Sequence, residues 1–216
     1  QTSNRFDARI LRNWANITPH QISKNSPNVR RDLKLGEKVV YFYGGNIGHA
    51  QDMTNLMRLA RSMQQYEGAH FLFVGQGDQV QLILKLAADW NLKNFSYLPS
   101  VSQEHFRDIL CQVDIGLFSL SAKHTAHNFP GKLLGYMVQS LPILGSVNLG
   151  NDLIPLFSDN DAGLVSVNGN DGTLLNHAVM LFESQALRRK LGIAGYNLLK
   201  KEFSVSTAAS IISKSF

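Results

Sequence analysis

The stretch VVYFYGGNIGHAQDMTNLMRLARSMQQYEGAHFLFVGQGD, residues 39–78, determines the fold class of this chain. It opens on five consecutive apolar or aromatic residues that end at a pair of glycines, which is typical of a strand buried on both faces in a parallel sheet. An apolar stripe predicts a helix over residues 50–66. The run AHFLFV predicts a second buried strand over residues 69–74. Together these segments predict a β-α-β unit.

The same alternation of strands and helices continues outward from this unit. We expect helices over residues 80–91 and 103–111, a short helix after residue 131, strands over 94–98, 114–118, 142–145 and 163–167, a short helix or turn over 153–157, and helical structure in the remainder. Helices between successive strands are crossover connections, which make the strands parallel and cover both faces of the sheet. Residues 38–216 are therefore expected to form a Rossmann-like, doubly wound α/β domain.

The first 37 residues differ in character from the rest. They are rich in Asn, Ser, Pro and Arg and show little periodicity, so we interpret residues 1–37 as an interdomain segment or linker that packs on the domain. The chain has no initiator Met and starts without a first strand. We therefore expect that further sequence precedes it in the natural protein.

The charge balance narrows the classes of ligand. The 21 Lys and Arg residues exceed the 16 Asp and Glu residues, which gives a net charge of +5 and a pI near 9.4. This excess suits an anionic ligand or an anionic membrane surface. No block of basic residues is interleaved with aromatic ones, so nucleic acid is the least favoured partner.

The single cysteine, Cys111, excludes an internal disulfide and fits a reducing compartment. We expect it to be a small buried apolar residue. No apolar run approaches the roughly 20 residues that span a bilayer, and the first residues do not form a signal peptide. We therefore expect a cytoplasmic location, with peripheral contact at the inner face of the cytoplasmic membrane left open.

Glycine-rich loops follow the expected strands, at the sheet edge where doubly wound proteins bind ligands. The loops GGNIG after the first strand and GQGD after the second allow a backbone to approach a bulky anion closely. Tight strand-to-helix turns are the alternative interpretation. The spacing matches neither the dinucleotide fingerprint GxGxxG nor a Walker A loop, which disfavours a nicotinamide dehydrogenase.

Residues 127–146, HNFPGKLLGYMVQSLPILGS, contain the main candidate site. A polar loop turns through Pro130 and Gly131 into a short helix, so that backbone N–H groups and Lys132 converge at one helix N-terminus. Because the helix dipole disfavours a cation there, a lysine is better explained if an anion shares the site, and we expect that anion to be a phosphate. A solvated surface lysine is the alternative.

Other polar and aromatic residues have simpler explanations. His124 and His127 have the spacing of a metal-binding pair, but no third ligand lies nearby in the sequence, so we predict no metal site. A polar contact to phosphate or sugar, or surface exposure, is expected for them instead. Asp114 is expected to be structural, and strand aromatics such as Tyr41 and Phe71 are expected to pack in the core.

Five motifs in order resemble the C-terminal half of family 4 glycosyltransferases of the GT-B fold. They are GNIGHAQ at residues 45–51, FVGQG at 73–77, YLP at 97–99, VDIGL at 113–117 and PGKLLGYMVQSLPI at 130–143. The sequence is most similar to the bacterial O-antigen and capsule enzymes that resemble L-fucosamine transferases. The resemblance extends from about Arg12 to the C-terminus.

The resemblance implies a donor-binding domain, with the N-terminal acceptor domain absent from this chain. Transfer would retain the anomeric configuration. The nucleotide-sugar donor, a UDP-sugar, would be a substrate, and no separate cofactor is expected. The acceptor would be a lipid-linked saccharide or a polysaccharide in bacterial lipopolysaccharide or capsule biosynthesis. The isolated fragment would be inactive, because the acceptor half is missing.

The resemblance also implies which residues form the site. Lys132 and His127 would take the catalytic roles, the loop at residues 45–48 would face the diphosphate, and the loop at residues 99–101 would border the base. The residues expected to contact the donor are Gly45, Asn46, Ile47, Gly48, Gln51, Gly75, Gly77, Val101, Asn128, Phe129, Pro130, Gly131, Lys132 and Gly135.

Two departures from the family pattern weaken this assignment. Members carry an E-x7-E pair whose second Glu binds the ribose hydroxyls, whereas His127 and Gly135 stand at these positions here. Members also present Arg and Lys to the diphosphate, where this chain has Asn46 and Gln51. A non-catalytic homologue or interaction module that has lost donor binding is therefore the main alternative. A sugar-nucleotide epimerase is a second one, for which we find no acidic and histidine pairs.

Overall fold

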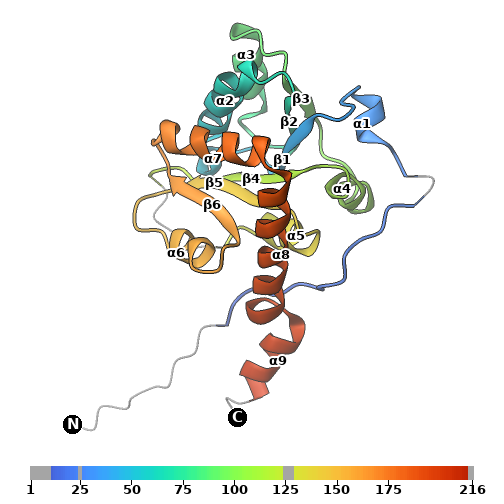
Figure 1. The fold of residues 1–216 in the computed structure, drawn as a ribbon, viewed down its shortest axis with the longest axis vertical. Coiled ribbons are helices and arrows are strands. Elements are labelled where there is room, and N and C mark those ends of the chain that lie inside the picture. Colours follow the sequence, from blue (N-terminus) through green and yellow to red (C-terminus); the bar gives the residue numbers. More distant parts are fainter. Residues whose placement is uncertain (1–10, 24–25, 124–128, 214–216) are drawn as a thin grey trace.

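The computed structural model describes residues 11–23, 26–123 and 129–213 and shows one parallel sheet between two layers of helices (Figure 1). The strands are β1 (Val39–Asn46), β2 (Ala69–Gln76), β3 (Phe95–Leu98), β4 (Ile115–Ser119), β5 (Ile143–Val147) and β6 (Gly163–Val167). Their order is β3-β2-β1-β4-β5-β6, and every neighbouring pair is parallel. The predicted doubly wound α/β fold is confirmed.

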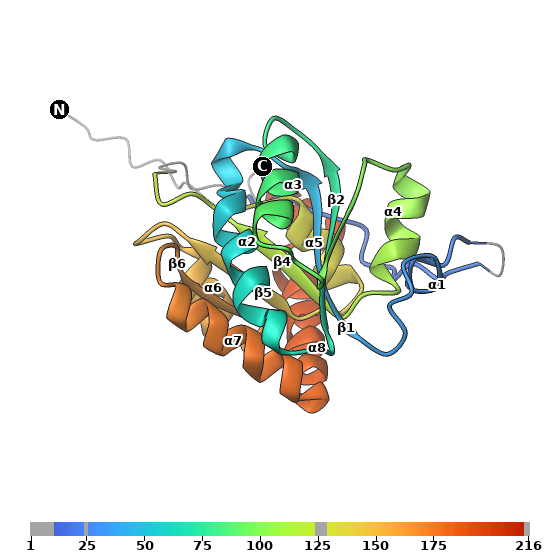
Figure 2. The ribbon, with the colours of Figure 1, turned by 90° about the horizontal axis from the view of Figure 1, so that it is seen from above.

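Helices cover both faces of this sheet (Figure 2). They are α1 (Val29–Asp32), α2 (Met53–Ser62), α3 (Val80–Asp89), α4 (Gln103–Leu110), α5 (Lys132–Val138), α6 (Leu153–Ser158), α7 (Asp171–Glu183), α8 (Gln185–Glu202) and α9 (Val205–Ser213), with 3-10 turns η1 (His49–Gln51) and η2 (Met63–Gln65). Residues of α2, α3 and α7 form one apolar core with the sheet, and residues of α4, α5, α6 and α8 form the other.

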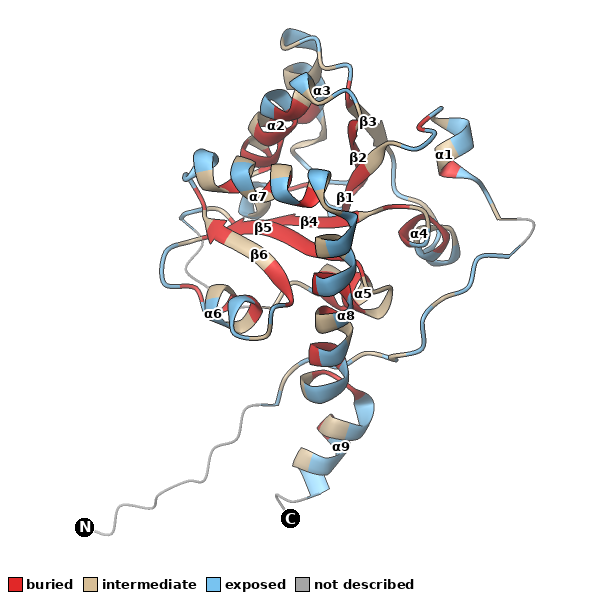
Figure 3. Ribbon diagram, viewed as in Figure 1, coloured by how far each residue is buried: buried red, intermediate tan, exposed pale blue. Residues whose placement is uncertain are grey.

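The first strand shows why the sheet is buried on both faces (Figure 3). Val40 and Phe42 pack into one core and Tyr41 and Tyr43 into the other, because successive side chains of a strand point to opposite faces. The Tyr41 ring stacks on Phe71 with 4.7 Å between centroids. The strand aromatics are therefore core residues, as predicted.

The boundaries around the first glycine loop differ from those expected. β1 and β2 continue through their glycines to Asn46 and Gln76. The helix expected from residue 50 begins at Met53, because Asp52 adopts a left-handed conformation (φ 42°) and accepts a hydrogen bond from the backbone N–H of Asn55. The chain from Gly48 to Gln51 is instead a short turn that leads from β1 into the helix.

Residues 11–23, which we call the strap, cross the side of the domain (Figure 1). At one end the N–H of Ala15 donates to the Phe203 carbonyl (2.9 Å). At the other end His20 Nε2 lies 2.7 Å from Asp108 Oδ1 on α4. Further along, the Arg30 guanidinium pairs with the Asp114 carboxylate at the start of β4, so Asp114 has the structural role that was predicted.

The expectation for Cys111 was wrong, because its side chain is exposed. Cys111 directly follows α4, whose buried positions are Asp108, Ile109 and Leu110, and its thiol donates to the His20 carbonyl at 3.4 Å. In the part of the chain that the structure describes, no helix combines the length and the hydropathy needed to cross a membrane.

Candidate functional site

A tyrosine hydroxyl separates the two central strands at the point where the strand order reverses. β1 and β4 pair only at Tyr41 with Ile115 and Phe42 with Gly116. After these two paired positions the strands are bridged by the buried Tyr136 hydroxyl. It accepts a hydrogen bond from the Gly44 N–H (3.1 Å) and donates one to the Leu117 carbonyl (3.2 Å). In doubly wound sheets this switch point is where a ligand-binding crevice opens.

Glycines make room for this arrangement. A Cβ on Gly116 would lie 2.4 Å from the Tyr136 ring, and one on Gly44 would lie 2.5 Å from the Phe106 ring. Neither position can hold a larger residue without moving its neighbours. The crevice therefore depends on glycines inside the strands as well as on those in the loops.

Lys132 lies at the bottom of the crevice. Its Nζ is buried although other parts of the residue are partly exposed, and among the described residues it has no hydrogen-bond partner. It lies 3.5 Å from the centroid of the Tyr43 ring, and a Cβ placed on Gly45 would be 3.9 Å from it. Burial lowers the pKa of Lys132 to about 7. The alternative of a solvated surface lysine is excluded by this geometry.

A small cavity of about 210 Å³ surrounds this lysine. It brings together residues from two segments that the sequence analysis singled out, namely Asn46 and Gln51 from the first and Pro130, Gly131 and Lys132 from the second. Asn46 Nδ2 donates to Gln51 Oε1 at 3.2 Å, which braces the loop after β1. The Tyr43 hydroxyl donates a hydrogen bond to the Asn46 carbonyl in the same loop.

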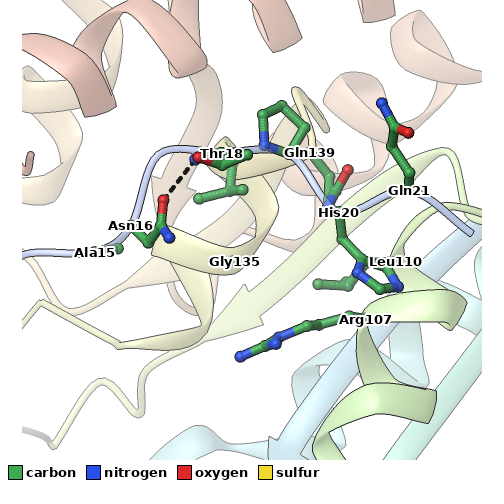
Figure 4. A pocket seen from close by; sticks show the side chains of 11 residues that line it. Ala15, Asn16, Thr18, His20, Gln21, Arg107, Leu110, Gly135 and Gln139 are labelled. Carbon is green, nitrogen blue, oxygen red and sulfur yellow. Dashed lines mark hydrogen bonds between the residues drawn. The ribbon is translucent and has the colours of Figure 1, made fainter.

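A larger cavity of about 440 Å³ borders Gly45 on the other side. Gly45, Gly75, Val101 and Gly135 line it, so four more of the expected residues share one space. A third cavity, of about 560 Å³, lies between the strap and helices α4 and α5 and also includes Gly135 (Figure 4).

Several of the residues expected to contact the donor also have structural roles. Ile47 is fully buried, its N–H donates to the Gln76 carbonyl (2.8 Å), and its carbonyl accepts from the Gln79 N–H (3.0 Å). A Cβ on Gly77 would lie 2.2 Å from the Ile47 oxygen, and one on Gly75 would lie 1.9 Å from the Gly45 oxygen. Ile47, Gly75 and Gly77 therefore hold the two loops together. A Cβ on Gly48 would crowd the Asn46 amide, so Gly48 belongs to the same packed turn.

The loop before α5 is anchored by an aromatic residue. The Phe129 ring packs on Phe203, with 4.5 Å between centroids, and lies 6.5 Å from Phe157. The Phe129 side chain therefore anchors the loop. His127 and Asn128, and His124 with them, lie outside the described residues. Among the residues that are described, no group of three His, Cys, Asp or Glu side chains could hold a metal ion.

Comparisons with known proteins give one clear result. Neither a protein-family model nor a curated protein matches the sequence significantly. Among solved structures, WaaG, a glycosyltransferase involved in lipopolysaccharide biosynthesis, superimposes with a TM-score of 0.74 and 13% identity over 95% of this chain and 55% of its own. The fold is that of a GT-B glycosyltransferase.

Two other solved structures indicate which half of a GT-B protein this chain resembles. Anabaena HepE in complex with UDP has a TM-score of 0.74 and 13% identity over 87% of this chain and 50% of its own. The C-terminal domain of LpcC from Francisella tularensis, a group 1 glycosyl transferase, has a TM-score of 0.69 and 15% identity over 88% of this chain and 96% of its own. This chain spans about half the length of WaaG and HepE and has the fold of a C-terminal GT-B domain.

Helix α4 supplies residues to the GT-B crevice that the sequence analysis did not select. Gln103, Phe106 and Arg107 line the cavity that contains Gly45 and Gly135. These residues are spaced three or four apart, so they share one face of the helix. That spacing was visible in the sequence, but nothing local indicates that this face turns toward α5.

Proposed function

We propose that this chain is the donor-binding domain of a glycosyltransferase that uses a nucleotide-sugar, and that Lys132 binds the donor diphosphate. The observation that carries the proposal is the buried Lys132 ammonium beside Gly45, which has no hydrogen-bond partner among the described residues. A buried ammonium without a hydrogen-bond acceptor is costly, and an anion bound above it would remove that cost. The UDP complex of HepE, which shares the fold, supports a nucleotide as the ligand.

The proposed role of Lys132 follows from the chemistry of the leaving group. When a glycosidic bond to a nucleoside diphosphate breaks, negative charge develops on the phosphate oxygens. A preorganised positive charge in a site shielded from water stabilises that charge more than it stabilises the ground state. The Gly45 backbone, which has no Cβ between it and the lysine, would let the diphosphate approach.

The cavities suggest where the remaining parts of the donor would bind. The space bounded by Gly75 and Val101 would take the nucleoside, with the base at the loop around residue 101. We propose a UDP-sugar as the donor, transfer with retention, and a lipid-linked or polysaccharide acceptor in bacterial surface polysaccharide synthesis, as in the L-fucosamine transferases that the sequence resembles. The acceptor would be bound by a further domain of the protein.

Calorimetric titration with UDP, GDP and uridine tests the proposal. In Lys132→Met, which keeps an apolar side chain of similar length, UDP binding should weaken about 10- to 100-fold, because a charged hydrogen bond contributes roughly 1.5–3 kcal/mol. Uridine binding should change less than about twofold, because uridine has no phosphate.

The exposed Lys93 provides a matched control, and Lys93→Met should leave both affinities unchanged. Equal weakening of UDP and uridine in Lys132→Met would contradict the phosphate role. If the unaltered chain bound no nucleotide at all, the alternative of a homologue that has lost donor binding would hold instead. The absence of a side chain at position 135 is the observation that favours this alternative.

A further inference from the structure

Among the described residues, no neighbour requires a glycine at position 135. A Cβ placed there would lie 3.5 Å from Leu110 Cδ1, which is an ordinary van der Waals contact. The position is inside α5, where glycine costs about 1 kcal/mol relative to alanine. Gly116 differs from Gly135 in this respect. A Cβ on Gly116 would lie 2.4 Å from the Tyr136 ring, so a glycine is sterically required there. The lack of a side chain at position 135 therefore leaves space beside the helix that the packing does not need.

Gly135 lies at the boundary of two cavities. The nucleoside cavity of about 440 Å³ and the strap cavity of about 560 Å³ share Arg107, Leu110 and Gly135 as lining residues. A long side chain at position 135 would occupy the boundary between them. With glycine there, a ligand bound in the first cavity can extend past α5 into the second.

The strap closes the far side of the second cavity (Figure 4). Asn16 accepts a hydrogen bond from the Thr18 N–H (2.9 Å), which shapes the strap locally. The bond of His20 to Asp108 ties the strap to α4, and the Tyr196 hydroxyl donates to the Ile17 carbonyl at 3.2 Å. The wall of the cavity is thus held in place from both ends.

Among the described residues that line the two cavities, Arg107 is the one Lys or Arg. Figure 4 shows the Arg107 side chain extending from α4 into the space beside Gly135. None of the described residues that line either cavity is acidic, and no carboxylate among the described residues pairs with Arg107. The neighbouring Asp108 is engaged by His20, and that hydrogen bond lowers the pKa of the Asp108 carboxyl. A group that enters the strap cavity therefore meets an exposed guanidinium that pairs with no carboxylate of the described residues, which suits an anion.

We propose that the strap cavity binds an anionic substituent on the nucleoside end of the ligand, with Arg107 as its charged partner and Gly135 as the opening through which it passes. The chemical class is a phosphate monoester or a carboxylate attached to the ribose. The Gln21 and Gln139 side chains, which line the same cavity, add amide donors. This inference rests on the proposed nucleotide site.

Titration with UMP and with uridine 2′,5′- and 3′,5′-bisphosphate tests the inference. At least one bisphosphate should bind about tenfold or more tightly than UMP, because its second phosphate reaches Arg107. In Arg107→Gln that gain should disappear, so that the ratio of bisphosphate affinity to UMP affinity falls to about one. Arg189→Gln, which changes an exposed arginine on α8, serves as the control and should keep the gain.

A second variant tests the opening itself. Gly135→Leu narrows the boundary between the cavities and favours the helix, so it should reduce the bisphosphate gain and leave the protein folded. Equal affinities of the unaltered chain for UMP and both bisphosphates would overturn the inference, as would equal weakening of all three ligands in Arg107→Gln. If UDP and UMP failed to bind at all, the proposed function itself would fail, which separates the two results.

Discussion

At the scale of single residues, the buried Lys132 ammonium is the feature with the largest chemical consequence. Removing a cation from water favours its neutral form, and burial accordingly lowers the pKa of Lys132 from 10.5 to about 7. A diphosphate bound beside it favours the charged form and raises the pKa again. Donor binding and protonation of Lys132 are therefore thermodynamically linked.

This linkage predicts proton uptake on binding. At pH 8.5 the free protein holds Lys132 mostly neutral, so UDP binding should take up close to one proton, and affinity should fall as the pH rises above about 7. Calorimetry in buffers of different ionisation enthalpy measures the uptake. Lys132→Met should bind UDP without it. Unchanged proton counts in the two proteins would show that Lys132 does not sense the phosphate.

At the scale of secondary-structure elements, Tyr136 connects α5 to the separation of β1 from β4. Its hydroxyl takes the place of a strand-to-strand hydrogen bond at Gly44 and Leu117. Burial raises the pKa of Tyr136 far above its ordinary value, so the hydroxyl keeps its proton. The same helix carries Lys132 and Gly135, so the position of α5 affects the whole crevice.

Tyr136→Phe should therefore destabilise the protein by about 1–3 kcal/mol, because it leaves a buried N–H and a buried carbonyl without partners. Urea unfolding followed by circular dichroism measures this loss. Tyr66→Phe makes the same chemical change where the hydroxyl has no partner among the described residues, and it should cost less than about 0.5 kcal/mol. A loss of the same size in both variants would show that the hydroxyl does not hold the strands.

At the scale of the whole molecule, the buried His70 makes stability depend on pH. His70 is buried in β2, where its Nε2 bonds Ser96 Oγ at 3.0 Å, and burial lowers its pKa to about 4. Burial lowers the pKa of His177 as well. The unfolded chain binds more protons than the folded one between pH 4 and 6.5, so stability must fall as the pH drops through that window.

The free energy of unfolding should accordingly be about 2 kcal/mol lower at pH 5 than at pH 7 on account of His70. His70→Gln removes the titrating ring and should flatten this dependence in urea titrations at the two pH values. His49→Gln, at an exposed histidine, should retain it. An unchanged pH dependence in His70→Gln would assign the acid sensitivity to other groups.

Much of the fold could be predicted from local patterns. The run from Val39 to Tyr43 is apolar at every position, which is enough to predict a strand buried on both faces, and the alternation with helices is enough to predict a parallel sheet. Helix ends were less predictable. Helix α2 begins later than expected because Asp52 adopts a left-handed conformation and its side chain caps the helix. This helix start depends on one residue and not on a periodic pattern.

The sequence by itself determined the order of strands and helices, the glycines at the sheet edge and the segment that contains Lys132, because each depends on the spacing of residues close in the chain. Only the tertiary structure decided that the Lys132 ammonium is buried, that Cys111 is exposed, and that Arg107 and Gly135 border one space. These properties arise from contacts between segments far apart in the sequence, where crossing helices and the strap set burial and charge. The periodicity of residues that are close in the sequence does not predict such contacts.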